Sequence, residues 1–263
     1  MQASSIAHYT ADIDARTPEE LDALFQEAAR YNQTLQSNNS SAGSVTSPAD
    51  PFQATASIPG YDEKLKIADA ALMGVLELPS IGITLPIYHG VDGATLRKGV
   101  GHVPNSALPI GGNGANPVLV GQRNSSHAVL FSNLDHVMVD DIVNLRVLDQ
   151  TYSYQVDQVR VVAPEDTTLY AALPGQDRVT LVTDAPARGS SHRLVVRAHR
   201  IDPVAATTGW LDANTRQLLV AAAILSAAGG GYVLWRALAR CKEAEDRRET
   251  KIFVHRTPHA SLT

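Results

Sequence analysis

Cysteine is almost absent from this sequence: Cys241 is the only one in 263 residues. A disulfide within the chain is therefore excluded, as are a cysteine-ligated zinc site and a thiol nucleophile in the first 240 residues. Aromatic residues make up only 5% of a chain that is 44% hydrophobic, so the core must be built largely from Val, Leu, Ile and Ala. Acidic residues outnumber basic ones, 27 to 22, and this balance gives no indication of a nucleic-acid partner.

The first 20 residues also lack the apolar run that a signal peptide or membrane anchor needs. A helix is predicted to begin near their end, because Thr17 and Glu20 form a capping box and Pro18 occupies the first helical position. Apolar residues follow at helical spacing: Leu21, Leu24, Phe25 and Ala28. We therefore expect residues 1–35 to form an N-terminal segment with an amphipathic helix.

Serine, asparagine and glycine dominate residues 36–48, which cannot bury enough surface to become ordered. Asp50, Pro51 and Phe52 follow, and they place an acid and an aromatic ring beside a rigid proline. The sequence predicts that residues 36–60 form a flexible linker that carries this short motif.

From Met73 to Ile201 the hydrophobic pattern becomes that of β-strands. Short runs rich in Val, Ile, Leu and Tyr are separated by Gly, Pro and Asp. Many strands with few helices between them indicate a mostly β fold, either a closed barrel or a sandwich. Short helical or irregular connections are expected at residues 134–139 and 164–170.

Residues 218–235 carry no charge over 18 positions, and a helix of this length spans about 27 Å, close to the thickness of a bilayer core. A transmembrane helix is expected here, with a buried core helix as the alternative. Five arginine and lysine residues follow it by position 248, whereas only Arg216 precedes it closely. The positive-inside rule predicts a single-pass protein of the cell membrane, with a linker at 206–217, a basic cytoplasmic tail at 236–263 and the β domain outside.

This orientation requires the whole β domain to cross the membrane, although nothing near Met1 would start its export. We therefore expect an N-terminal anchor to be missing, through a misassigned start or a truncated gene. A hydrophobic segment encoded immediately upstream of Met1 would support the first explanation.

Several blocks follow one another in a characteristic order. They are ITLPIYHGV (83–91), LRKGVGHVPNSALPIGG (96–112), VLVGQR (118–123), LFSNLD (130–135), YQVDQVRVVAPEDT (154–167), RVTLVTDAP (178–186) and HRLVVRAHRI (192–201). Together they resemble the class C, pilin-polymerising sortases of Gram-positive bacteria. The resemblance covers residues 17–240 and includes the preceding helix, the Asp-Pro-Phe motif and the C-terminal apolar segment.

What the resemblance implies is a closed eight-stranded sortase-type β-barrel over residues 61–205, outside the membrane. Such enzymes cleave LPXTG-type sorting signals through a cysteine thioester, which a lysine amine of the next pilin subunit resolves. Three residues carry the chemistry: a His in a VL-x-G-H-R block, a Cys that ends a TL-x-T-C strand, and an Arg beyond the Cys. The implied partners are LPXTG-type sorting-signal peptides or pilin subunits, with the membrane, and no cofactor is implied.

Of these three residues only the Arg is kept, as Arg193. Gln122 stands at the His position and Asp184 at the Cys position. A carboxylate lacks the softness and weak solvation of a thiolate, and its attack on an amide would have to form a high-energy anhydride. Glutamine neither takes nor gives a proton near neutral pH. We therefore expect thiol transpeptidation to be abolished, because members of a catalytic unit act together.

A lid covers the active site in the resembling family, where its Asp pairs with the Arg and its aromatic residue covers the nucleophile. Transferred to this sequence, Asp50 would approach Arg193 and Phe52 would lie over Asp184. Asp184 is itself an anion near Arg193, however, and it could form an internal ion pair that needs no lid. An unanchored loop at residues 50–52 is the remaining alternative.

Other histidines are weaker candidates for the missing chemistry. His127 is interpreted as a solvated loop residue, and residues 190–192 as polar positions that flank a strand. Alternation puts His199 on the same face as Arg193, where a surface histidine, or one with its hydrogen bonds satisfied, is expected rather than a base. The histidines and carboxylates lack metal-ligand spacing, so no metal site is predicted.

Three functions remain open from the sequence. The first is an inactive sortase homologue, a membrane-tethered pseudoenzyme that still holds a sorting peptide. The second is an active transpeptidase or hydrolase that uses unusual residues, and the third is a decaying gene product without a present role. Binding of an LPXTG-type peptide without cleavage would distinguish the first from the other two.

Overall fold

The computed structural model describes residues 2–42, 50–54, 59–67, 72–123, 130–186 and 191–201. Within those ranges, no helix has the length and apolar character that a bilayer crossing requires. The expected transmembrane helix at 218–235, with the linker before it and the tail after it, lies outside the described residues. The membrane topology therefore stays a prediction.

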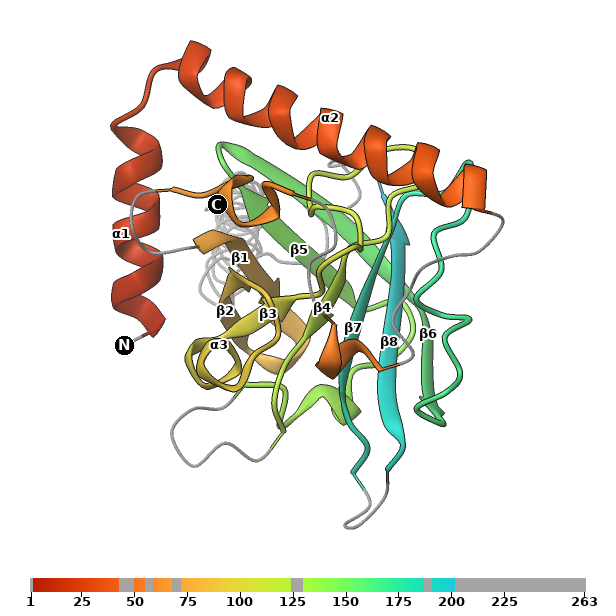
Figure 1. Cartoon of the computed structure of the whole chain (residues 1–263). Helices are drawn as coiled ribbons and strands as arrows, with labels where there is room; N and C mark the ends of the chain where they lie inside the picture. Colours follow the sequence, from red (N-terminus) through yellow and green to blue (C-terminus); the bar gives the residue numbers. More distant parts are fainter. Residues whose placement is uncertain are drawn as a thin grey trace, which may run out of the picture. The chain divides into compact units, whose positions relative to one another are not determined.

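Eight strands form a closed barrel, as expected (Figure 1). They are β1 (Leu72–Leu78), β2 (Ile83–His89), β3 (Val100–His102), β4 (Val118–Val120), β5 (Ile142–Val147), β6 (Gln150–Val162), β7 (Arg178–Asp184) and β8 (Arg193–Arg200). Their order around the barrel is β1-β2-β3-β4-β7-β8-β6-β5. The β2/β3 and β4/β7 pairs are parallel, and the other neighbours are antiparallel.

Few helices accompany the barrel. They are α1 (Gln2–Asp14), α2 (Pro18–Ala42) and α3 (Gly93–Lys98), and single 3₁₀ turns occupy Pro51–Gln53, Tyr61–Glu63, Pro79–Ile81 and Leu134–His136. The last of these turns confirms the short helical connection expected at 134–139. Residues 164–170 form irregular turns, also as expected.

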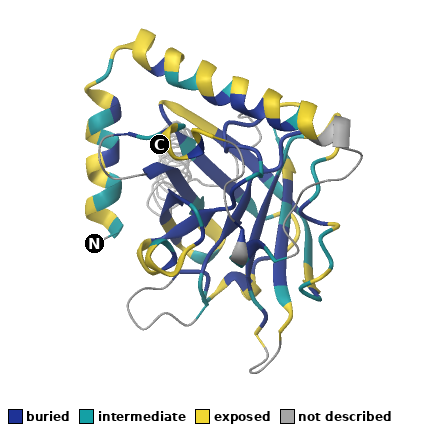
Figure 2. Cartoon of the chain, in the orientation of Figure 1, coloured by how far each residue is buried: buried dark blue, intermediate teal, exposed yellow. Residues whose placement is uncertain are grey.

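Alternation along the strands gives the barrel wall two buried faces (Figure 2). Leu119, Leu181 and Val196 belong to the main hydrophobic core. Val120, Val182 and Val195, on the opposite face of the same strands, join a second and smaller cluster. Because the Asp50–Ala54 segment packs on this second cluster, the outer face of β4, β7 and β8 is covered as well.

The N-terminal half of α2 confirms the predicted helix start. Thr17 N donates to Glu20 Oε2 at 2.9 Å, and Glu20 N donates to Thr17 Oγ1 at 3.3 Å, which is the reciprocal pattern of a capping box. The Asn32 side chain then fixes the helix to the barrel, since it donates to Leu108 O at 3.2 Å and accepts from Leu108 N at 2.7 Å.

Two features of the N-terminal region differ from the expectation. The flexible linker predicted from residue 36 is wrong for residues 36–42, because α2 continues to Ala42. Leu35 is buried, and Gln36 Nε2 donates to Asn113 O at 2.8 Å, so tertiary contacts carry the helix into a stretch of weak helix formers. Helix α1 was not predicted, and it is attached through Tyr9, whose hydroxyl accepts from Leu148 N at 2.9 Å.

A buried polar cluster joins the barrel to the chain that follows Asp50–Ala54, the predicted lid segment. Tyr61 Oη accepts from Gly90 N at 3.1 Å and lies 2.9 Å from His102 Nδ1. His102 Nε2 lies 2.8 Å from Ala107 O and therefore carries the proton, and the Tyr61 hydroxyl donates to His102 O at 3.0 Å. His102 is fully buried, and this burial lowers the pKa of its imidazole to about 4, against the hydrogen bond to Ala107. The fold therefore contains a neutral histidine.

Candidate active site

Strand register brings Asp184 and Arg193 together. Asp184 is the last residue of β7, Arg193 is the first of β8, and the two are direct partners in the antiparallel pair. The Arg193 guanidinium donates through Nη1 to Asp184 Oδ1. The Asp184 side chain is 50% exposed, whereas that of Arg193 is only 14% exposed. A partly buried cation is thus held at the edge of the barrel wall by a half-exposed carboxylate.

The Asp50–Ala54 segment contributes a second carboxylate to the same arginine. Asp50 begins the Pro51–Gln53 turn by accepting from Phe52 N at 3.2 Å through Oδ1. Its other oxygen, Oδ2, accepts from Arg193 Nη2 at 2.8 Å. The predicted Asp50–Arg193 ion pair is therefore confirmed, and the alternative of an unanchored loop is wrong. In Figure 1 this turn lies against β4, with which it is in contact.

Phe52 contacts the cation of the site. Its ring centroid lies 4.4 Å from Arg193 Cζ, a distance typical of a cation–π contact. Asp184 and Asp50 bind different nitrogens of Arg193. The Asp50–Arg193 and Asp184–Arg193 ion pairs, which the sequence presented as competitors, therefore exist at the same time. Two carboxylates and one guanidinium leave one negative charge in excess, and Asp184 is the more exposed of the two acids.

Gln122 lies at the end of the strand next to β7. The β4/β7 pairing aligns Val120 with Val182, and Gly121 N extends it by donating to Val182 O at 3.1 Å. Gln122 and Asp184 each stand two residues beyond the Val120–Val182 pair. Among the described residues, no hydrogen bond joins the Gln122 side chain to Asp184 or Arg193. Gln122 thus lies at the same end of the barrel as Asp184, as predicted, but its side chain makes no polar contact with Asp184 or Arg193 in the described part of the chain.

Neighbouring residues fix the backbone around Gln122. Its carbonyl accepts from Phe131 N at 3.1 Å, and the next residue, Arg123, pairs with Asp135 at 2.9 Å. Gly121 is packed so closely that a Cβ atom there would lie 2.5 Å from the Phe131 ring. These contacts define the site's edge on either side of residues 124–129, which lie outside the described residues together with His127.

Tyr170 brings a buried hydroxyl to the same face. Its ring belongs to the second hydrophobic cluster, and its hydroxyl oxygen has no hydrogen-bond partner within the described residues. Burial raises the pKa of Tyr170 to about 12, with Arg193 opposing the rise and Asp50 adding to it. The phenol of Tyr170 therefore stays protonated. The influence of Arg193 and Asp50 places it beside the Asp50–Arg193 ion pair.

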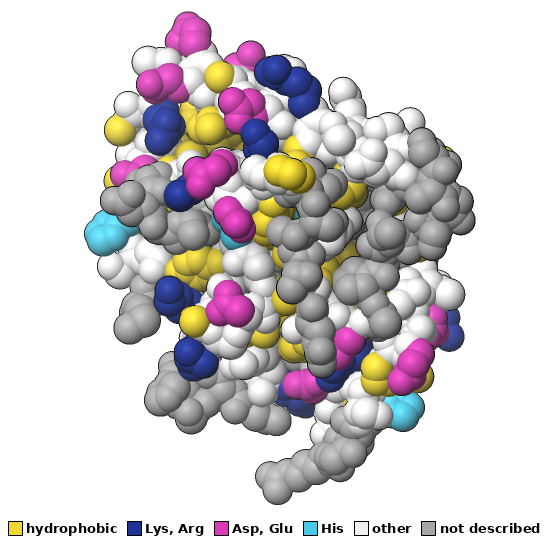
Figure 3. Space-filling model, in the orientation of Figure 1, with side chains coloured by type: hydrophobic (Ala, Val, Ile, Leu, Met, Phe, Trp, Pro, Cys, Tyr) yellow, Lys and Arg dark blue, Asp and Glu magenta, His cyan; other side chains and the backbone are white. Residues whose placement is uncertain are grey.

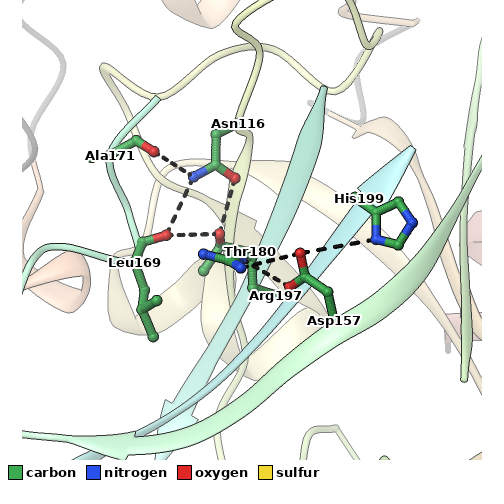
Figure 4. Close-up of polar contacts among 7 residues, drawn as sticks. All are labelled: Asn116, Asp157, Leu169, Ala171, Thr180, Arg197 and His199. Atoms are coloured by element: carbon green, nitrogen blue, oxygen red, sulfur yellow. Dashed lines mark hydrogen bonds and ion pairs between the residues drawn. The ribbon is translucent and has the colours of Figure 1, made fainter. Parts of the chain in front are cut away.

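Asn116 holds the connection between β6 and β7 in place (Figure 4). Its Nδ2 lies within 3.4 Å of the carbonyl oxygens of Leu169, Tyr170 and Ala171, and its Oδ1 accepts from Thr180 Oγ1 at 2.9 Å. Asn116 and Thr180 are both buried. Asn116 and Tyr170 were not predicted from the sequence, because the contact between them joins residues 54 positions apart along the chain.

Figure 4 also shows a second ion pair on this face. Arg197 binds Asp157 through Nε at 2.8 Å and Nη2 at 3.1 Å, and His199 Nδ1 lies 3.9 Å from the same carboxylate. The His199 side chain is 46% exposed, which confirms the surface histidine expected there. His192 is exposed directly before β8, also as expected. Within the described ranges, no group of three or more His, Cys, Asp or Glu is placed to hold a metal ion.

Removing the charge of Asp184 is expected to hold the lid segment more firmly. When the lid leaves, Arg193 keeps Asp184 as a partner, so its partly buried guanidinium is not left unpaired. In an Asp184→Asn variant this partner is lost, and amide hydrogen exchange at Phe52 should slow roughly fivefold, which corresponds to about 1 kcal/mol.

The matched Asp50→Asn variant should show the opposite change, because it weakens the lid's own bond to Arg193. Exchange at Phe52 that is equal in both variants would show that Asp184 does not affect how firmly the Asp50–Ala54 segment is held.

A closed eight-stranded barrel with this strand order is the fold of a sortase-type domain. The sortase domain family model matches residues 76–201. Sortase C of Streptococcus pneumoniae is similar in structure, with a TM-score of 0.67 and 33% identity over 76% of this chain and 97% of that one. Sortase A of Corynebacterium diphtheriae gives 0.64 and 36% over 76% and 94%.

Sequence comparison with curated proteins gives a shorter match. Sortase A of Streptococcus agalactiae is 28% identical over 130 residues, which are 48% of this chain and 52% of that protein. The chain thus spans about half the length of that relative. From the family model and the solved structures together, this chain belongs to the sortase family, and the predicted resemblance to class C sortases is confirmed.

Proposed function

We propose that this chain is a catalytically impaired, class C sortase-like protein that binds a sorting signal without transferring it. The observation that carries the proposal is the β7 end, where Asp184 is engaged by Arg193 at the position that resembles the family's nucleophile. No thiol occurs anywhere in the barrel, since Cys241 is the only cysteine of the chain.

The chemistry of the site argues against acyl transfer. Attack of Asp184 on a peptide carbonyl would form a mixed anhydride and expel an amine, which is a far poorer leaving group. Gln122 cannot protonate that amine, because an amide neither gives nor takes a proton near neutral pH. Arg193 could still donate to a peptide carbonyl, but it is already engaged by two carboxylates.

Peptide binding survives these losses in our proposal, because it depends on the surface beneath the lid. Val120, Val182 and Val195 form an apolar floor there, and Tyr170 adds a protonated hydroxyl without a partner in the described part of the chain. The ligand class we propose is the LPXTG-type sorting signal or pilin segment. In support, the structure of S. pneumoniae sortase C, which resembles this one, gives insight into pilin substrate specificity.

A fluorescent LPXTG-type peptide tests this function directly. We expect saturable binding in the micromolar to millimolar range by anisotropy, no cleavage, and no covalent adduct by intact-mass analysis. A scrambled peptide of the same composition is the control. Equal binding of both peptides would refute recognition, and release of the C-terminal fragment would support the alternative of an active enzyme with unusual residues.

We also propose that residues 218–235 anchor the protein in the cell membrane, with the tail at 236–263 in the cytoplasm and the barrel outside. The support is the uncharged run and the basic residues that follow it. Protease added to intact cells should then remove the barrel and leave the tail. A barrel that stays protected while the membrane is intact would contradict this topology.

A further inference from the structure

A cavity separate from the candidate active site lies between α2 and the chain that follows the Asp50–Ala54 segment. Its volume is about 390 Å³, and it is lined by Glu27, Arg30, Tyr31, Thr34, Pro59 and Lys64. This volume is within the range of sites that hold small molecules. Figure 1 shows the turn at Tyr61–Glu63 beneath α2, and Figure 3 shows acidic and basic side chains intermingled along that edge.

Tyr31 lines this cavity and carries a hydroxyl that is an unused hydrogen-bond donor. The residue is only 5% exposed, its ring packs 6.3 Å from that of Tyr61, and its hydroxyl is buried without a partner among the described residues. A buried hydroxyl with no partner is unfavourable, and phenylalanine would provide the same ring without that cost. The oxygen therefore indicates a ligand group that accepts a hydrogen bond.

The charges around the cavity define the sign of that group. Lys64 is paired with Glu27 at 3.1 Å, so these two nearly cancel. Arg30 uses Nε for Gln26 O at 3.2 Å, and its guanidinium makes no ion pair with any described residue, so one positive charge remains. Asp62 is the nearby acid that opposes an anion, but it is exposed and does not line the cavity. Burial and Asp62 together raise the pKa of Tyr31 to about 12, which keeps the phenol as a donor.

We propose that this cavity binds the carboxylate of an amino-acid-sized ligand, with Tyr31 Oη and the Arg30 guanidinium as donors. The paired Lys64 and Glu27 would form its rim, and Thr34 offers a further hydroxyl. Pro59 comes five residues after Ala54 in the sequence, so a bound ligand would connect α2 to the chain that leaves the lid. The site is independent of the proposed sorting-signal function.

N-acetylalanine and its neutral amide provide matched probes, because they differ in charge and little in shape. In a titration of the full chain followed by calorimetry, we expect the carboxylate to bind at least tenfold more tightly than the amide. Tyr31→Phe and Arg30→Gln should each weaken binding roughly fivefold or more, whereas Arg97→Gln, an exposed arginine on α3, should not.

The melting temperature separates binding from a structural role of Tyr31. Tyr31→Phe removes only an unpaired oxygen, so the unliganded variant should melt at the same temperature as the unaltered chain or higher. Equal affinity for acid and amide, unchanged affinity in both variants, or a lower melting temperature of Tyr31→Phe would each overturn the proposal.

Discussion

A chain that carries Asp184→Cys together with Gln122→His is expected to form an acyl-thioester with an LPXTG-type peptide, whereas the unaltered chain forms none. The two changes restore a soft nucleophile at the β7 end and a proton shuttle at the neighbouring β4 end. Arg193 is already in place beside residue 184. In another acyl-transfer enzyme, loss of the catalytic nucleophile or base lowers the rate constant by up to about 10⁶-fold. We therefore expect the acylation rate of the double variant to exceed the detection limit set by the unaltered chain by more than roughly 10³-fold.

The single variants are the controls for this result. Asp184→Cys alone provides a thiol without a proton donor and should acylate slowly, and Gln122→His alone should give no adduct. Intact-mass analysis after exposure to peptide measures all four chains. An adduct on the unaltered chain would refute impairment. A folded double variant without any adduct would show that the site departs from the family beyond these two residues.

Stability is expected to fall as the pH drops below 6.5, because of His102. Its folded-state pKa is lowered to about 4 by burial, while the unfolded value stays near 6.5. Between these values the unfolded chain binds a proton that the folded barrel excludes, so protons favour unfolding. The shift corresponds to about 3 kcal/mol of unfolding free energy, present above pH 6.5 and lost progressively by pH 4.

Urea unfolding at several pH values, compared between the unaltered chain and His102→Gln, measures this contribution. Glutamine retains a donor for Ala107 O but does not titrate, so the variant should show a flatter pH dependence over this interval. Asp177, whose pKa is raised by burial, acts in the opposite direction and is common to both chains. Parallel pH profiles of the two proteins would exclude His102 as the cause.

Local sequence signals predicted much of the fold. The Thr17–Glu20 capping box, the β pattern after Met73 and the connection at 134–139 depend on neighbouring residues, and each is present. Helix α1 had a comparable signal in the spacing of Ile6, Tyr9 and Ile13, but its stretch of Ser, Thr and Asp concealed it. The end of α2 could not be placed, because Gln36 is held by Asn113, a residue 77 positions away.

In the candidate site too, some features could be predicted from the sequence and others depend on contacts between distant residues. A family resemblance, rather than a local pattern, predicted that Asp50 would meet Arg193 across 143 positions. It could not predict that Arg193 would bind both carboxylates at once, because that depends on the angles of one guanidinium. Tyr170 and Asn116 have no sequence signature, since each acquires its role from residues that are far away along the chain.

The strand order also constrains how the protein is made. β8, the last strand, is inserted between β6 and β7, and β4 pairs with β7 from residues about 60 positions later. A nascent chain that still lacks β8 therefore leaves two strands, β6 and β7, with open edges, which readily associate with those of other chains. Because so many pairings join distant segments, collapse into the native state should be slow and should follow completion of the barrel sequence. Chaperone dependence during synthesis is the expected consequence.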